Sequence, residues 1–144
     1  MVNPAQFRKE IVNDFLMIVI SGRIDEAYKK HVDMTGKHHN QYVAAGFPAL
    51  KQAMIENHTQ FPDKRIDIKH VIAEGDLVAS HSHGKLNPGN KNIAVVHIFR
   101  FQGDKIAEFW DIGQEIIPDS PNEDGMFKLI IFLKSAHMEE PAVV

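Results

Sequence analysis

The 144-residue chain contains no cysteine, which excludes disulfides, thiolate nucleophiles and zinc sites built on cysteine. Its 16 basic and 19 acidic residues are scattered without a block of like charge, so an electrostatic footprint for nucleic acid or an anionic membrane is missing. The apolar run FLMIVI is too short to cross a bilayer, and charges interrupt the N-terminus where a signal peptide needs its apolar core. We therefore expect a cytoplasmic protein that binds neither nucleic acid nor membrane. The length and the 44% hydrophobic content predict one domain with one core.

The first 62 residues are predicted to be mostly helical. Asn3 and Pro4 form a helix start signal, and apolar residues then recur at helical spacing until Gly22. A second helix is expected from about Ile24 to Val32, because its acids come first and its bases last. The polar segment MTGKHHNQYVAAG predicts a loop, and FPALKQAMIENHTQF predicts a third helix that Pro62 stops.

From Arg65 onward the pattern changes to that of strands. Four segments qualify, RIDIKHVIA, LVASHSHGKL, IAVVHIFRFQ and KIAEFWDIGQEII, and the turns EGD, NPGNKN and Gly103-Asp104 separate them. Helices followed by such strands predict an α+β fold with the helices on one face of a curved antiparallel sheet. The later run FKLIIFLKSAH fits either a strand or a helix.

Asp111 and His97 are the first candidates for chemistry, because both are titratable groups on otherwise apolar strands. Asp111 follows Trp110 and closes an apolar stretch, a setting that raises the pKa of a carboxylate. A tight hairpin at Gly103-Asp104 would put His97 and Asp111 on opposite faces, whereas a β-bulge would bring them to one face. Arg100 is expected to pair with Glu108 or with Asp111, and pairing with Asp111 would weaken the base.

Two further histidines lie on the strand before His97. If NPGNKN closes a hairpin, His81 and His97 fall roughly opposite each other on one face, so we expect His81 to line a pocket. His83 alternates with His81, and the three histidines together would suggest a metal site. The flanking carboxylates of known metal motifs are missing, so we predict no metal here and a rim or surface position for His83.

Four segments carry a family resemblance: HNQYVAAG, IAEGDLVASHSH, VVHIFRFQGDKIAEFWDIGQ and NEDGMF. Together they resemble the SnoaL-like polyketide cyclases within the nuclear transport factor 2-like fold, which also includes ketosteroid isomerase and limonene epoxide hydrolase. The resemblance covers about residues 5–127 of a single domain over residues 1–144, with 128–144 as a C-terminal extension. It implies a cone-shaped α+β barrel, in which a strongly bent antiparallel sheet and three N-terminal helices enclose an apolar pocket. It also implies a homodimer.

The resemblance further implies roles for individual residues. Asp111 matches the family's acid/base aspartate for intramolecular aldol condensation, and His97 matches the histidine on the neighbouring strand. His39-Asn40 matches the histidine-asparagine pair after the second helix, although Gln41 replaces the proline that often follows it. Either His97 or His39 would steady an enolate, and Trp110 would shape the pocket. The substrate would be a small apolar carbonyl compound, and no cofactor is expected.

Two other classes of function stay open at this point. The same cone can hold a small apolar ligand without catalysis, because a fold hosts many functions. Alternatively, the domain is purely structural and dimerises through the outer face of its sheet, which predicts a pocket filled by side chains.

Overall fold

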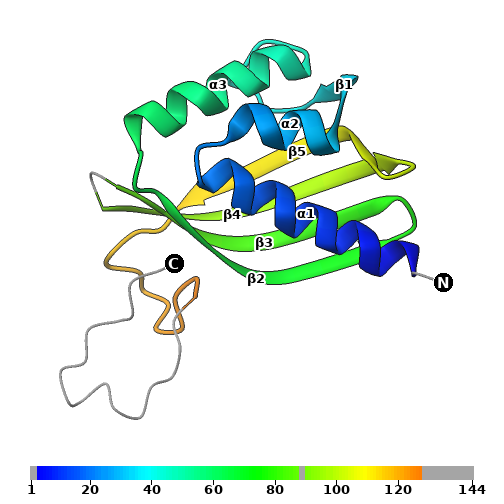
Figure 1. The fold of residues 1–144 in the computed structure, drawn as a ribbon. Coiled ribbons are helices and arrows are strands. Elements are labelled where there is room, and N and C mark those ends of the chain that lie inside the picture. Colours follow the sequence, from blue (N-terminus) through cyan, green and yellow to red (C-terminus); the bar gives the residue numbers. More distant parts are fainter. Residues whose placement is uncertain (1–2, 88–89, 128–144) are drawn as a thin grey trace.

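The computed structural model describes residues 3–87 and 90–127, which form three helices and five strands. Their order is α1 (Pro4–Ile20), α2 (Ile24–His31), β1 (Val32–His38), α3 (Phe47–Gln60), β2 (Arg65–Glu74), β3 (Leu77–Leu86), β4 (Lys91–Gln102) and β5 (Lys105–Glu115). The three helices lie on one side of a curved sheet (Figure 1). The predicted α+β architecture is therefore confirmed. The run FKLIIFLKSAH lies outside the described residues except for Phe127.

The predicted helix signals act as expected. The side chain of Asn3 caps α1 by accepting a hydrogen bond from the Ala5 N–H at 3.0 Å, and Pro4 occupies the first turn. The helix ends at Ser21, and Gly22 follows with φ of +90°. A Cβ at Gly22 would run into the ring of His58, so the closeness of α3 also requires glycine here. Of the described helices, none combines the length and apolarity that crossing a bilayer requires.

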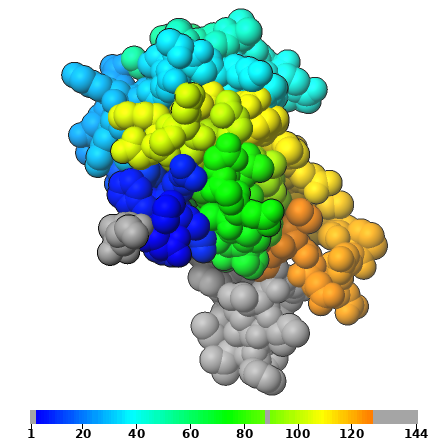
Figure 2. Space-filling model, turned by 90° about the vertical axis from the view of Figure 1, so that its right-hand side faces the viewer, coloured from blue at the N-terminus to red at the C-terminus, as the bar shows by residue number. Residues whose placement is uncertain are grey.

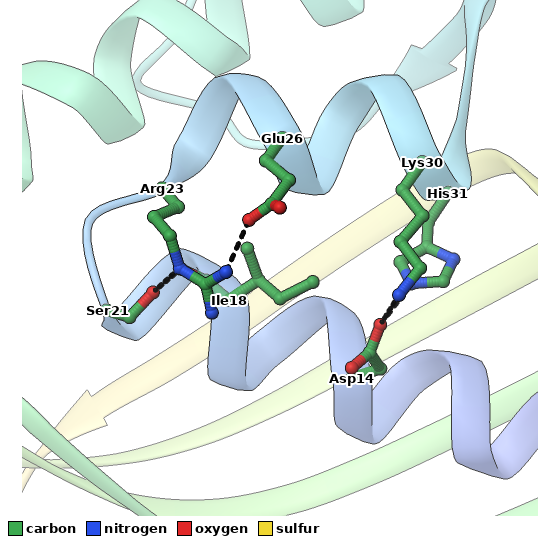
Figure 3. Close-up of polar contacts among 7 residues, drawn as sticks. All are labelled: Asp14, Ile18, Ser21, Arg23, Glu26, Lys30 and His31. Atoms are coloured by element: carbon green, nitrogen blue, oxygen red, sulfur yellow. Dashed lines mark hydrogen bonds and ion pairs between the residues drawn. The ribbon is translucent and has the colours of Figure 1, made fainter.

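Polar contacts between helices fix α2 against α1 (Figure 3). One carboxylate oxygen of Asp14 on α1 accepts hydrogen bonds from Lys30 at 3.0 Å and from His31 at 2.7 Å, both at the end of α2. These bonds hold the pKa of Asp14 below its usual value. At the start of α2, the Arg23 guanidinium pairs with Glu26 at 2.6 Å and also donates to Ser21, which follows α1, at 3.0 Å. The pairs are exposed, so their contribution to stability is small and their effect is on orientation.

The sheet has the order β1-β5-β4-β3-β2, and it is mixed because β1 runs parallel to β5 while the other neighbours are antiparallel. The prediction of a loop from Met34 was therefore wrong for Met34–His38, which belong to β1, and α2 ends at His31, one residue before the predicted end. β1 buries only its two ends and Gly36 lies between them, so no alternation marks it as a strand. Its strand conformation comes from pairing with the edge of β5.

The core lies between the helices and the inner face of the sheet. Its centre is a set of buried aromatic rings in edge-to-face and tilted contacts, with centroids 5.1–6.2 Å apart: Phe15, Tyr28, Phe47, Phe99 and Phe109. Such contacts add to the free energy of burial. The core holds α1, α2 and α3 against the inner face of the sheet.

The segment after β5 lies on the other side of the sheet. Figure 2 shows it in orange beside the green strands. The ring of Phe127 stacks on His83 at 4.7 Å and meets His81 at 5.0 Å, while Lys69 approaches its face at 5.9 Å. This part of the outer face is thus covered by the chain itself.

A substitution at Gly36 tests how closely β1 packs against β5. A Cβ at this position would overlap the Ala107 carbonyl on β5, so Gly36→Ala must push the two backbones apart and should destabilise the protein by about 1–3 kcal/mol. Gly113→Ala on β5 is the matched control, because its nearest contact would be an ordinary 3.5 Å and its φ is not positive. Urea unfolding of both variants checks the difference. Equal stability of the two would contradict this packing.

Candidate active site

A β-bulge decides which side chains of β5 face the core. Residues of β4 and β5 pair as Gln102 with Lys105 and Phe101 with Ile106, and the register then shifts so that Arg100 pairs with Glu108. Ala107 is the extra residue on β5. Because of this shift His97 pairs directly with Asp111, and directly paired residues of antiparallel strands point to the same face.

A cavity of about 390 Å³ opens in front of this pair, between α1, α3 and the inner face of the sheet. Its walls are mainly apolar, with Phe15, Leu16, Val43, Leu50, Met54 and Phe109 among them. Asn40, His97 and Asp111 are polar members of the lining. A second hollow of about 640 Å³, between the segment 39–42 and the far ends of β4 and β5, shares Asn40 and Asp111 with the first. The cavity contradicts the purely structural alternative, which predicted a pocket filled by side chains.

Asn40 is held in one orientation and aims its amide at Asp111. Its Oδ1 accepts a hydrogen bond from the Tyr42 N–H at 2.8 Å, so its Nδ2 is the end that donates to Asp111 Oδ2 at 3.0 Å. The preceding turn is fixed by His38, whose Nδ1 accepts from the Asn40 N–H at 3.1 Å and whose Nε2 donates to the Ala44 carbonyl at 2.7 Å. A buried histidine thus sets the position of the asparagine, and the asparagine orients the carboxylate.

His97 is a buried, neutral imidazole at physiological pH. Burial lowers its pKa from the ordinary 6.5 to about 4, although the nearby negative charge of Asp111 acts in the opposite direction. Its ring stacks on Phe109 at 5.5 Å and meets Phe99 at 6.0 Å. Within the described part of the chain, His97 Nδ1 and Asp111 Oδ1 are both buried and have no hydrogen-bond partner. Both residues line the cavity from neighbouring strands, and each keeps one buried polar atom without a described partner.

Arg100 does not reach Asp111. Its Nε donates to Glu108 Oε1 at 2.8 Å on the outer face, and Lys37 lies 3.9 Å from the same carboxylate. The hydrogen bond from Arg100 holds the pKa of Glu108 below its usual value. The first of the two predicted pairings is thus observed, and Asp111 faces the cavity without a basic side chain to neutralise it.

His39 and Trp110 lie beside the site rather than inside the cavity. His39 Nε2 is 2.5 Å from Glu108 Oε2, and its ring stacks on Trp110 with centroids 4.9 Å apart. Trp110 neighbours Asp111 along β5, so its side chain points to the outer face. The structure therefore places His39 at the edge of the second hollow and leaves Trp110 out of the lining of both.

His81 is on the wrong face for the role we expected. Ser80, not His81, pairs with His97, so His81 points outward and meets the His70 ring with Nδ1 atoms 3.1 Å apart. The turn between β3 and β4 sets a register one residue away from the predicted one, and a shift of one residue reverses the face of every side chain. His81 and His83 consequently cannot meet His97 around a metal ion. The described residues contain no cluster of three or more metal-ligating side chains.

Sequence analysis missed several polar groups of the inner face and the cavity. Ser80 and Ser82 lie fully buried on β3 with unpaired hydroxyls, and Asn57 and Lys64 line the cavity at the end away from Asp111. The alternation of β3 was the available signal for the serines, because Val78, Ser80 and Ser82 share one face. No comparable pattern marks Lys64, which precedes β2.

Comparison with protein families identifies the family to which the chain belongs. The family model of SnoaL-like polyketide cyclases matches residues 10–117, which is most of the chain and includes Asn40, His97 and Asp111. The chain belongs to the SnoaL-like polyketide cyclase family. The resemblance to this family is thereby confirmed, and three of the four segments lie within the matched residues, whereas NEDGMF follows them. No curated protein matches the sequence.

Solved structures share the nuclear transport factor 2-like fold with this SnoaL-like protein. AclR from Streptomyces galilaeus, a candidate hydroxylase, is 20% identical with a TM-score of 0.65, over 76% of this chain and 90% of AclR. A candidate polyketide cyclase from Acidithiobacillus ferrooxidans is 20% identical with a TM-score of 0.64, over 78% and 92%. A SnoaL-like polyketide cyclase from Agrobacterium tumefaciens is 14% identical with a TM-score of 0.64, over 74% and 91%. At these identities the likeness establishes the fold.

The neutral state of His97 can be tested by titration. Its ring resonances should follow a pKa of about 4 in NMR spectra, assigned with His97→Gln. The unfolded chain binds the proton near the ordinary pKa of 6.5, so the folded state is most stable above that pH and loses stability as the pH falls toward about 4. The loss at full protonation should be roughly 3 kcal/mol.

The unfolding free energy of His97→Gln should lack this dependence between pH 6.5 and 4. Glu108 and Asp14 also have lowered pKa values, but their contribution to stability changes only near and below their ordinary values of 4.5 and 3.8. The range from pH 6.5 to about 5 therefore reports on His97. A His97 pKa near 6.5 would show a solvated ring and would contradict the buried site.

Proposed function

We propose that the protein is a cofactor-independent enzyme that moves a proton next to a carbonyl group of a small apolar molecule, in an aldol-type cyclisation or an isomerisation. The observation that carries the proposal is the direct pairing of His97 and Asp111 across the bulged hairpin. Both residues line the same cavity, and each has one buried polar atom without a described partner. Buried polar atoms are normally paired, so unpaired ones in a cavity favour a ligand that supplies the partner.

In this mechanism Asp111 acts as the base. Its carboxylate takes a proton from the carbon next to a carbonyl, and the electrons of that C–H bond move onto the carbonyl oxygen to give an enolate. Asn40 holds the carboxylate through Oδ2, which leaves Oδ1 for the proton. No described basic side chain forms an ion pair with Asp111, so the carboxylate needs no dissociation from one before it reacts.

His97 acts as the hydrogen-bond donor to the developing enolate oxygen. A neutral imidazole carries one N–H, and because burial keeps the pKa at about 4, the ring stays in this form throughout the neutral range. A donor already fixed in a dry site stabilises a developing charge more than the same donor in water. Stacking on Phe109 holds the ring in place.

The reaction closes without an added reagent. In a cyclisation the enolate carbon attacks a second carbonyl carbon of the same molecule, a C–C bond forms, and the new alkoxide takes the proton that Asp111 holds. In an isomerisation Asp111 returns the proton to another carbon of the enolate. Both are redox-neutral, and the apolar walls of the cavity keep water away from the enolate.

Exchange of hydrogen for deuterium next to a carbonyl tests this chemistry without knowledge of the natural substrate. The protein in D₂O should speed deuterium incorporation into 1-tetralone or a similar apolar ketone, read by mass spectrometry. Asp111→Asn should lower the catalysed rate by about 100-fold or more, since it removes the base. His97→Gln should lower it by about tenfold through loss of the donor.

Asp104→Asn is the matched control, because Asp104 lies exposed in the β4–β5 turn and its change should leave the rate unaltered. Ketone binding by the Asp111→Asn variant, followed by NMR, separates catalysis from mere binding. Wild-type protein that binds the ketones without exchange, and an Asp111→Asn variant that binds them equally well, would replace this proposal with a non-catalytic binding protein.

Homodimerisation and a cytoplasmic location also belong to this proposal. Ile72 on β2 and Ile112 on β5 are 66% and 59% exposed and lie on the outer face of the sheet, where an apolar dimer contact would cover them. Sedimentation velocity would test the dimer.

A further inference from the structure

The cavity has a second polar end, formed by Asn57 at the close of α3 and by Lys64 and Arg65 at the start of β2. On the sheet, Arg65 pairs with Lys85 and Ile66 with Gly84, whereas Ser80 marks the row that contains His97 and Asp111. Four residues along β3 separate the two rows, which corresponds to roughly 13 Å. One cavity therefore has two polar ends with an apolar middle.

The charges of these two ends differ. Lys64 and Arg65 are the two basic residues in the lining, and Asp111 at the far end is its one acidic residue, among the residues that the structure describes. Arg65 is exposed and pairs with Lys85, which puts its side chain on the outer face, so Lys64 is the basic residue that serves the cavity. Neither Lys64 nor Arg65 forms an ion pair within residues 3–87 and 90–127. The ammonium group of Lys64 thus lies at one end of a mainly apolar cavity without a described acid to compensate it.

Lys64 is a partly buried hydrogen-bond donor and not a fully solvated surface lysine. Its Nζ donates a hydrogen bond to Asn57 Oδ1 at 2.6 Å, and the side chain is partly buried. Burial lowers the pKa of Lys64, because a desolvated ammonium group loses part of its hydration. The bond to Lys64 uses the oxygen of the Asn57 amide, so its Nδ2 remains available as a second donor beside the ammonium.

We propose that Lys64, with Asn57 beside it, binds a carboxylate of the substrate at the end of the cavity opposite Asp111. The inference rests on the proposed function, and it adds that the substrate is an elongated, mainly apolar carbonyl acid rather than a neutral molecule. The carboxylate restores the partner that a desolvated ammonium lacks, while the reacting carbonyl lies roughly 13 Å away beside His97 and Asp111. Attachment at the charged end therefore selects the orientation in which the reactive end meets the base.

A matched pair of probes tests this assignment. Biphenyl-4-carboxylate and biphenyl-4-carboxamide have nearly the same shape and differ in charge. By isothermal titration calorimetry, the wild-type protein should bind the carboxylate about tenfold more tightly than the amide, as expected for one charge-assisted hydrogen bond. Lys64→Met should abolish this preference by weakening carboxylate binding about tenfold, with amide binding unchanged within about twofold.

Control variants separate charge from stability. Lys64→Arg keeps a cation and should keep the preference, whereas Lys64→Gln keeps a donor for contact with Asn57 and should lose it. Lys29→Met removes the same charge from an exposed position at the end of α2 and should change nothing. Thermal unfolding confirms that each variant is folded, and the result for Lys64→Gln decides the case if Lys64→Met does not fold.

The outcomes separate this inference from the proposed reaction. Asp111→Asn should keep the preference for the carboxylate, because the base lies at the other end of the cavity. Equal affinity of the two probes for the wild type, an unchanged preference in Lys64→Met and Lys64→Gln, or no binding of either probe at about 1 mM would each overturn the carboxylate site. Deuterium exchange into neutral ketones does not involve Lys64, so it judges the reaction independently.

Discussion

The position of Ala107 as an extra residue in β5 is the constraint on which the site depends. Without it, the register of the β4–β5 turn would continue, Trp110 would pair with His97, and Asp111 would point to the outer face. The bulge also constrains β1. The Ala107 carbonyl occupies the space where a Cβ of residue 36 would lie, and Gly36 has no Cβ to meet it. The extra residue Ala107 thus sets both the register of the site and the position of β1.

The bulge also divides the polar groups of β5 between two faces with opposite character. On the outer face Glu108 forms polar contacts with Arg100, His39 and Lys37, so its negative charge is compensated by several partners. On the inner face Asp111 has one neutral partner, Asn40, and keeps a buried oxygen without any described partner. A carboxylate in the second setting has unused hydrogen-bonding capacity, which is what a base or a ligand-binding group requires.

The sequence predicted most of the architecture, because caps, periodicity and turns are local signals. The helix from Pro4 and the four antiparallel strands follow from such signals, and the family motifs identified Asp111, His97 and Asn40 as residues of one site. Errors arose where a distant partner decides the outcome. Strand β1 exists because β5 offers an edge, and His81 faces outward because the β3–β4 turn sets a register that alternation alone leaves undetermined. For the same reason the sequence left open whether the β4–β5 hairpin is tight or contains a bulge.

The central claim is that His97 binds the carbonyl or enol oxygen of a ligand while Asp111 faces the carbon next to it. A crystal structure with 2-naphthol, a flat enol analogue small enough for a cavity of about 390 Å³, tests it most directly. The account predicts the hydroxyl within hydrogen-bonding distance of a ring nitrogen of His97 and the neighbouring ring carbon facing Asp111 Oδ1, with the rings against Phe109. A naphthol bound elsewhere, or bound in this cavity with its hydroxyl pointing away from His97, would contradict it.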